Sequence, residues 1–197
     1  TIDNKLISMW KKYPNFCRYL HLPIQSGSDE ILKKMRRKYT CNEYLSFVQE
    51  VKQELQDICL GTDIIVGFPG ETDELFDQTY NFLNQSPIDY FHVFSYSERQ
   101  MSHSRKFENT VCSSEIKKRS LKCRNLHNSK WNMFLKNKLK TSADVLFEQE
   151  KRGFWVGTTE HFIKVKVESG EKLKNKVKKI KFNSIKDNHI VGEIIES

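Results

Sequence analysis

The chain of 197 residues is long enough for one medium domain, or for one domain and a small additional module. Hydrophobic residues make up 38% and charged residues 29%, which predicts a soluble protein that can build a core. No apolar run approaches the length that spans a bilayer, and no signal-peptide pattern follows Thr1. We therefore expect a cytoplasmic protein with no membrane partner.

The net charge of +8 is concentrated in the middle of the chain. Residues 101–140 carry 11 Lys and Arg against 2 Asp and Glu, whereas residues 1–100 carry 11 against 14 and residues 141–197 carry 11 against 9. Such asymmetry indicates a polyanionic partner. The five cysteines match no CxxC pair or zinc spacing, so we expect reduced thiols and no metal ligands in this chain.

Helices and strands alternate along the first half of the chain. Apolar spacing predicts strands at 18–25, 58–66 and 89–96, and helices at 4–12, 29–37, from Thr40 onward (with a capping box) and 73–84. Strands separated by helices favour parallel pairing with right-handed crossovers. Because three parallel strands cannot cover their own faces and edges, we expect them to be part of a larger sheet or barrel.

Polar side chains fall at the ends of two of these predicted strands. Asp63 interrupts an apolar strand that runs into a loop containing Gly67, and Gln25 ends the preceding strand. Ligands of α/β sheets bind at the carboxyl edge of the strands, so the pattern predicts a site there. A plain turn between strand and helix, whose glycines serve geometry alone, is the alternative reading.

The second half of the chain changes character twice. Residues 113–139 predict one or two basic helices, either a solvated surface or a surface that faces nucleic acid. Residues 143–197 alternate apolar and polar positions over five short strands, which fits a small OB-like barrel. Its aromatic residues lie among lysines and arginines, as in modules that stack on bases, although core filling explains part of this set.

Three runs of residues carry a resemblance to a known family. Residues 21–28 (His-Leu-Pro-Ile-Gln-Ser-Gly-Ser), 35–40 (Met-Arg-Arg-Lys-Tyr-Thr) and 62–71 together resemble the radical S-adenosylmethionine methylthiotransferases, and the C-terminal module resembles their TRAM domain. The resemblance implies an α/β fold: the C-terminal half of a radical-SAM, partial TIM-type parallel barrel at 1–112, a basic helical linker at 113–140 and an OB-like TRAM barrel that binds RNA at 141–197.

The resemblance also implies that the chain corresponds to the second half of such an enzyme. The family's CxxxCxxC motif, which holds the radical-generating 4Fe-4S cluster, does not occur in this sequence. We therefore expect the missing half to bind the iron–sulfur clusters, and we expect no catalysis from this polypeptide alone. The resemblance identifies no catalytic residue here.

The same resemblance implies residues that contact S-adenosylmethionine. Gln25 corresponds to a position that contacts the ribose or methionyl group, and Asp63 to one that contacts the ribose. Arg37, or its neighbour Arg36, corresponds to the arginine that reaches the cofactor's carboxylate. Gly67 is expected to let the backbone approach the ligand. Phe94 corresponds to the position that packs against the adenine.

The substrate expected from the resemblance is a modified adenosine next to the tRNA anticodon. Residues 91–97 (Phe-His-Val-Phe-Ser-Tyr-Ser) are most similar to the branch that methylthiolates N6-threonylcarbamoyladenosine. The loop that follows keeps an arginine and loses the family's glycine. The residues expected to contact RNA are Arg99, Lys122, Lys130, Arg152 and Lys164.

Other functions stay open at the level of the sequence. The enzyme could act on isopentenyladenosine in tRNA or on an aspartate of a ribosomal protein, and the chain could be an RNA-binding module that catalyses nothing. The oligomeric state is not indicated by any pattern.

Overall fold

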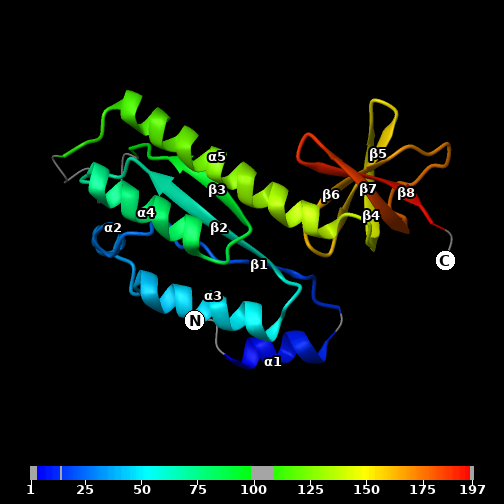
Figure 1. The fold of residues 1–197 in the computed structure, drawn as a ribbon, viewed down its shortest axis with the longest axis horizontal. Helices are drawn as coiled ribbons and strands as arrows, with labels where there is room; N and C mark the ends of the chain where they lie inside the picture. Colours follow the sequence, from blue (N-terminus) through cyan, green and yellow to red (C-terminus); the bar gives the residue numbers. More distant parts are fainter. Residues whose placement is uncertain (1–3, 14, 99–108, 196–197) are drawn as a thin grey trace. The chain divides into compact units, whose positions relative to one another are not determined.

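A three-stranded sheet organises the first part of the protein, and a closed five-stranded barrel organises the last part (Figure 1). The computed structural model describes residues 4–13, 15–98 and 109–195. Its contacts divide the chain into a sheet unit, made of residues 20–56 and 60–128, and a barrel unit, made of residues 1–19, 57–59 and 129–197. The boundaries predicted after residues 112 and 140 stay a prediction.

The sheet has the order β1 (Tyr19–His21), β2 (Cys59–Val66), β3 (Tyr90–Ser95). Strands β2 and β3 are parallel, as predicted, with Ile65 beside Phe94. The predicted first strand, 18–25, is shorter than expected, because Pro23 has no N–H and the Ile24 N–H donates to the Thr62 hydroxyl, at 2.9 Å. The strand resumes as an isolated parallel bridge between Gln25 and Ile64.

Five helices lie in the described residues: α1 (Asn4–Lys12), α2 (Asp29–Lys34), α3 (Cys41–Glu54), α4 (Asp73–Gln85) and α5 (Ser113–Lys138). The predicted capping box is present, since the Thr40 hydroxyl accepts from Glu43 N and the Glu43 carboxylate accepts from Thr40 N. The basic segment forms one helix, α5, of 26 residues, drawn green to yellow in Figure 1.

The helix predicted at 29–37 ends three residues early, at Lys34. Arg36 lies in the left-handed region, at φ 58°, and its N–H donates to Lys33 O. The Arg37 N–H donates to Leu32 O, which completes a Schellman motif and closes the helix. Arg37 therefore lies in the loop after α2, a correction to the expected helical position.

Helices cover one face of the sheet and build its core. Ile24, Ile64, Val66 and Phe91 pack there against α4 and α5. Two buried residues of α5, Cys123 and Leu126, join this core, and the partly buried Ile116 packs against it. Because alternate residues of a strand point to opposite faces, Asp63, Ile65, His92 and Phe94 lie on the other face.

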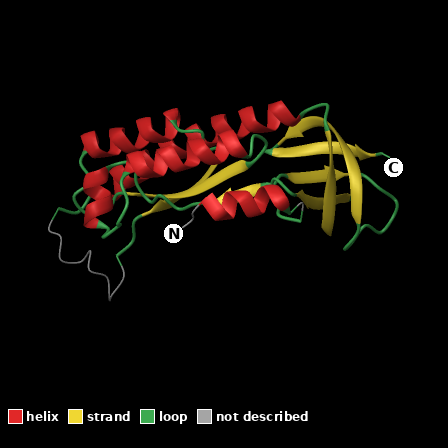
Figure 2. Ribbon diagram, turned by 90° about the horizontal axis from the view of Figure 1, so that it is seen from below, coloured by secondary structure: helices red, strands yellow, loops and turns green. Residues whose placement is uncertain are grey.

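The barrel is built from the strands β4 (Ser142–Lys151), β5 (Phe154–Thr159), β6 (Lys164–Val167), β7 (Val177–Lys186) and β8 (His189–Ile194). They close in the order β4-β5-β6-β8-β7, with β6 and β8 parallel, and Figure 2 shows them wrapped around one another. The five predicted strands are confirmed. The turns at Arg152-Gly153 and Asp187-Asn188 have positive φ at both residues, which is the two-residue turn that matches strand twist.

The aromatic residues of the barrel divide between its core and its surface. Trp155 and His161 are buried, whereas Phe162 is 52% exposed and stacks on Tyr19 at 4.7 Å between ring centroids. Core filling therefore explains part of the aromatic set. None of the described helices is long and apolar enough to cross a membrane.

Candidate functional site

Gln25 lies beside Asp63 in the sheet, because the segment that carries Gln25 pairs with strand β2. The Gln25 N–H donates to Asp63 O and Gln25 O accepts from Ile65 N, both at 2.9 Å. Gln25 adopts φ 75°, a left-handed conformation uncommon for a side chain of its size. This strained backbone is held in place by hydrogen bonds on both sides.

The Asp63 carboxylate faces the side of the sheet opposite the helices and contacts a histidine. Its Oδ1 atom lies 3.1 Å from His21 Nε2, and both side chains are partly exposed. His92, in register with Asp63 on β3, has its ring 5.9 Å from that of His21. In the sequence, His21 stands out only as the first residue of the run 21–28, and its polar side chain between the apolar Leu20 and Leu22 was the available signal for a site.

Phe94 shares this face of the sheet, which we call the uncovered face because its described side chains are partly or largely exposed. It is 50% exposed, and its ring lies 6.1 Å from that of His92. An acid, two imidazoles and an aromatic ring are therefore displayed on one face: Asp63, His21, His92 and Phe94. These groups can accept or donate hydrogen bonds to a polar ligand and stack on a planar one.

Arg37 lies near the segment of residues 23–25, which ends in Gln25. The adjacent Tyr39 hydroxyl donates to Ile24 O at 3.1 Å and to Pro23 O at 3.2 Å. Burial raises the pKa of Tyr39, and the positive charge of Arg37 acts in the opposite direction, so the guanidinium lies within electrostatic range of that hydroxyl. Arg37 itself is exposed.

Gly67 approaches a helix at close range. It adopts φ 79°, and a β-carbon there would collide with the Ile116 side chain of α5. Its N–H donates to the Glu71 carboxylate at 2.9 Å. The close packing of α5 thus accounts for the glycine, and its predicted contact with a ligand stays a prediction.

A buried ion pair fixes the loop after β2, and no sequence pattern predicts it. Glu71 Oε1 accepts from Arg119 Nη1 at 2.7 Å, with side-chain exposures of 0% and 4%. Arg119 also donates to Glu71 O and to Asp73 Oδ1. Burial raises the pKa of Glu71, although the Gly67 N–H and the guanidinium both favour its carboxylate. Nothing in the sequence pairs residues 48 positions apart.

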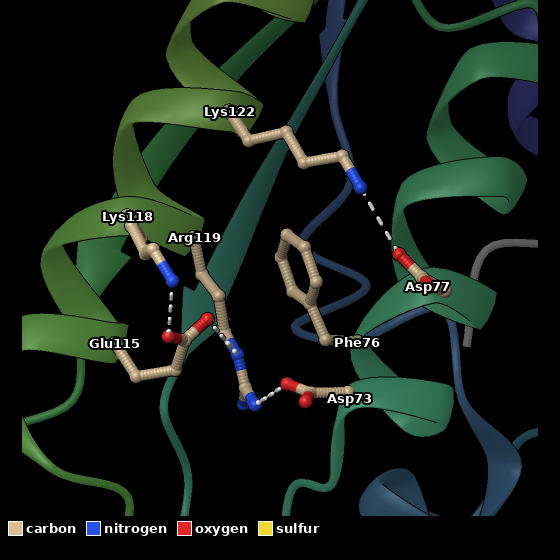
Figure 3. A pocket seen from close by; sticks show the side chains of 7 residues that line it. All are labelled: Asp73, Phe76, Asp77, Glu115, Lys118, Arg119 and Lys122. Atoms are coloured by element: carbon tan, nitrogen blue, oxygen red, sulfur yellow. Dashed lines mark hydrogen bonds and ion pairs between the residues drawn. The ribbon is translucent and has the colours of Figure 1, made fainter.

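The surface between α4 and α5 holds a pocket of about 530 Å³ lined mainly by charged side chains. Figure 3 shows each cation facing an acid: Lys118 with Glu115, Arg119 with Asp73 and Glu115, and Lys122 with Asp77. Lys122 and Arg119 both lie 5.3 Å from the centre of the Phe76 ring. Two of these ion pairs, Arg119 with Asp73 and Lys122 with Asp77, join α5 to α4. We call these four residues the α4–α5 clasp.

The described residues that are expected to contact RNA are divided between the two units. Arg99 lies outside the described residues. Lys122 belongs to the α4–α5 clasp, whereas Lys130 lies half-buried on α5 in the barrel unit. Arg152 is exposed in the β4–β5 turn, and Lys164 pairs with Glu148 at 3.1 Å.

The described cysteines form no disulfides. In the described part of the chain, no group of three or more histidine, cysteine, aspartate or glutamate side chains is arranged to hold a metal ion. Burial raises the pKa of Cys41 and Cys123 to about 12, which keeps both thiols protonated.

Comparison with known proteins gives matches along the chain. Residues 1–83 match the family model described as the radical SAM superfamily. A protein of Campylobacter jejuni subsp. doylei named tRNA-2-methylthio-N(6)-dimethylallyladenosine synthase is 31% identical over 195 residues, covering 98% of this chain and 45% of that protein.

Two further relatives point the same way. The synthase of the same name from Geobacillus thermodenitrificans is 44% identical over 119 residues, covering 60% of this chain and 23% of that protein. A protein of Methanocaldococcus jannaschii named probable threonylcarbamoyladenosine tRNA methylthiotransferase is 36% identical over 180 residues, covering 90% and 40%. The chain thus spans less than half the length of these curated relatives.

Proposed function

Because this chain belongs to the radical S-adenosylmethionine methylthiotransferase family, we propose that it supplies part of the cofactor pocket and an RNA-holding barrel of a tRNA-modifying enzyme. The single observation that carries the proposal is the uncovered sheet face, on which Asp63, His21 and Phe94 stand together. Relatives along the whole chain are named as enzymes that methylthiolate tRNA adenosines, which supports the same function.

The side chains on this face fit S-adenosylmethionine chemically. The Asp63 carboxylate and the Gln25 amide suit ribose hydroxyls and the methionyl ammonium group, and Phe94 suits the adenine ring. The Arg37 guanidinium suits the cofactor's carboxylate, because its planar fork can bind two oxygens at once. In the radical SAM family the cofactor and a 4Fe-4S cluster together supply the methyl group and the radical chemistry.

The residues of this chain have a positioning role in that reaction. His21 holds the Asp63 carboxylate through a contact of 3.1 Å, and the left-handed turn at Gln25 fixes the amide next to it. Gly67 and the Glu71–Arg119 pair hold the following loop against α5. A rigid support of this kind orients a ligand before the chemistry begins.

The spacing of the five cysteines does not fit the iron–sulfur cluster of this family, because no CxxxCxxC motif occurs among them. We expect the cluster ligands to come from outside these residues, and this polypeptide alone to release no 5′-deoxyadenosine from S-adenosylmethionine under reducing conditions. Detection of that product, with an iron–sulfur chromophore in the purified chain, would contradict this expectation.

The barrel is proposed as a TRAM-like, OB-like module that binds tRNA in the cytoplasm. Its five strands close with a parallel β6–β8 pair, a topology compatible with small barrels that bind oligonucleotides. The excess of lysine and arginine in the second half of the chain supports a polyanionic partner.

The substrate proposed first is N6-threonylcarbamoyladenosine, on the strength of the residues from Phe91 to Ser97 and of the relative from Methanocaldococcus jannaschii. Dimethylallyladenosine is the second candidate, because the relatives from Campylobacter and Geobacillus carry that substrate in their names. Nucleoside mass spectrometry of tRNA from a strain lacking the gene separates the two. Loss of the methylthio group from threonylcarbamoyladenosine supports the first, its loss from dimethylallyladenosine supports the second, and unchanged tRNA contradicts both.

A further inference from the structure

The densest run of positive charge in the barrel unit lies between residues 172 and 181, where six of ten residues are lysine and none is acidic. Two of the six have acid partners: Lys178 lies 3.7 Å from Glu171, and Lys181 lies 3.5 Å from Glu193. The other four are exposed, and no carboxylate of the described chain lies within 4 Å of them. We call these four the β7 lysine patch: Lys172, Lys174, Lys176 and Lys179.

The backbone beneath the patch is fixed by hydrogen bonds to β4. Asn175 N donates to Phe147 O at 2.8 Å, and Phe147 N donates to Lys176 O at 3.0 Å. Leu173 is fully buried and anchors the loop before β7. The lysines are thus presented from an ordered backbone, so little backbone entropy is lost when they meet a partner.

An exposed aliphatic pair lies beside the patch. Leu146 of β4 and Val177 of β7 are register partners on the outer face of the barrel, 47% and 60% exposed. Lys179 is two residues beyond Val177 and shares that face. Asp144, in register with Lys179, adds an opposing charge there.

We propose that this outer β4–β7 face, with the β7 lysine patch, is where the barrel contacts RNA. The ammonium groups meet backbone phosphates, and Leu146 and Val177 pack against ribose or base edges. The inference rests on the proposed function and differs from the sequence prediction, which placed the barrel contacts at Arg152 and Lys164. Lys164 is already paired with Glu148, whereas no carboxylate of the described residues lies within 4 Å of the patch lysines, and Asp144 is the acid opposite Lys179.

Salt-dependent binding tests the patch directly. The probe is fluorescently labelled unfractionated tRNA, and the protein is the whole chain carrying K172A, K174A, K176A and K179A together. Each phosphate contact contributes about 0.7 to 0.9 to the slope of log K against log salt, so the four substitutions are expected to reduce that slope by about 3. Binding at moderate salt is expected to weaken about tenfold or more.

The matched control removes four other exposed lysines that have no acid partner among the described residues: K117A, K136A, K151A and K186A. This variant has the same net charge as the patch variant, and its slope is expected to stay within about 1 of the wild type. Far-UV circular dichroism verifies that both variants are folded, which surface substitutions of this kind should leave unchanged.

Two further variants test the rest of the face. L146A with V177A is expected to weaken tRNA binding without changing the salt slope, because the pair contributes no charge. D144N is expected to strengthen binding, since it removes the opposing carboxylate.

The outcomes separate this inference from the proposed function. Equal slopes for the patch and control variants overturn the location of the RNA contact while RNA binding itself stands. Failure of the wild-type chain to bind tRNA at low salt overturns the RNA-holding role of the barrel. Binding to vesicles containing anionic lipid, in place of tRNA, overturns the identity of the partner.

Discussion

A single carboxylate, Asp63, shows how a residue that breaks an apolar pattern can indicate a site. It is predicted as a ligand contact because it interrupts the buried strand β2. The structure adds its neighbours: His21 at 3.1 Å and, through the adjacent backbone, Gln25. The two strands bring together residues that are 42 and 38 positions apart, which only pairing in the sheet could do.

Substituting these side chains tests their role toward the cofactor. In an enzyme of the length of its relatives, Asp63→Ala and Gln25→Ala are each expected to weaken S-adenosylmethionine binding about tenfold, the equivalent of one lost hydrogen bond to a charged or polar group. Isothermal titration calorimetry measures the Kd. Gln78→Ala, an exposed position on α4, is the control and should leave the Kd unchanged. Unaltered affinity in both site variants would reject the assignment.

The Glu71–Arg119 pair illustrates a residue-scale feature of stability. Its two side chains are almost completely buried, and the carboxylate also accepts the Gly67 N–H. Such a pair is weak evidence of net stabilisation, but removing one partner leaves a buried charge without compensation.

Arg119→Met is therefore expected to destabilise the protein by about 3–5 kcal/mol. Urea denaturation followed by circular dichroism measures the loss. Lys118→Met removes a neighbouring cation whose side chain is 78% exposed, and should change stability by no more than about 1 kcal/mol. If the two variants unfold at the same urea concentration, removing one partner of the buried pair does not lower the free energy of unfolding as expected.

At the scale of elements, the turn after β1 explains how α4 docks. Gly27 packs so closely that a β-carbon there would lie 2.7 Å from Phe82 Cβ and 2.8 Å from Thr79 Cα. The Thr79 hydroxyl also accepts the Gly27 N–H and contacts the Ser26 hydroxyl, both at 3.1 Å. The turn at residues 26–28 thus also forms the surface against which helix α4 packs.

Gly27→Ala is expected to push α4 away and to destabilise the protein by about 1–3 kcal/mol, as overpacking does. Thermal unfolding is the measurement. Gly170→Ala is a matched control, because a β-carbon at Gly170 meets nothing within 4 Å and should change stability by less than about 0.5 kcal/mol. Similar melting temperatures for the two variants would contradict the close packing.

At the scale of the whole molecule, a half-buried histidine couples folding to pH. His127 on α5 accepts the Phe91 N–H at 3.2 Å and meets the rings of Tyr90 and Phe91 edge-on. Burial lowers its pKa to about 4, and His92 acts in the same direction. Between this value and about 6.5, the unfolded chain binds a proton that the folded chain does not.

The stabilising contribution of neutral His127 is thus fully present above about pH 6.5 and is lost as the pH falls toward about 4. Because the ring is partly exposed, we expect a difference of about 1–2 kcal/mol over this range. His127→Gln should reduce the pH dependence of the urea midpoint between these values. A variant with the same pH dependence as the wild type would show that other groups are responsible.

By itself, the sequence determined three features: the capping box at Thr40, the five barrel strands with their alternating apolar and polar residues, and the parallel pairing of strands in the sheet. Each depends on residues close together in the chain, through periodicity or short-range hydrogen bonds. Its motifs also identified the family, which the relatives support.

Only the tertiary structure decided what those residues meet. It paired Glu71 with Arg119 and placed His21 against Asp63. It also ended α2 at Lys34, because the backbone of Arg36 adopts the left-handed conformation that a glycine usually takes at the end of a helix. It also showed that Lys122 and Lys164 have acid partners, while no carboxylate of the described residues lies within 4 Å of the β7 lysine patch. These outcomes depend on contacts between distant segments, which packing creates and no local pattern encodes.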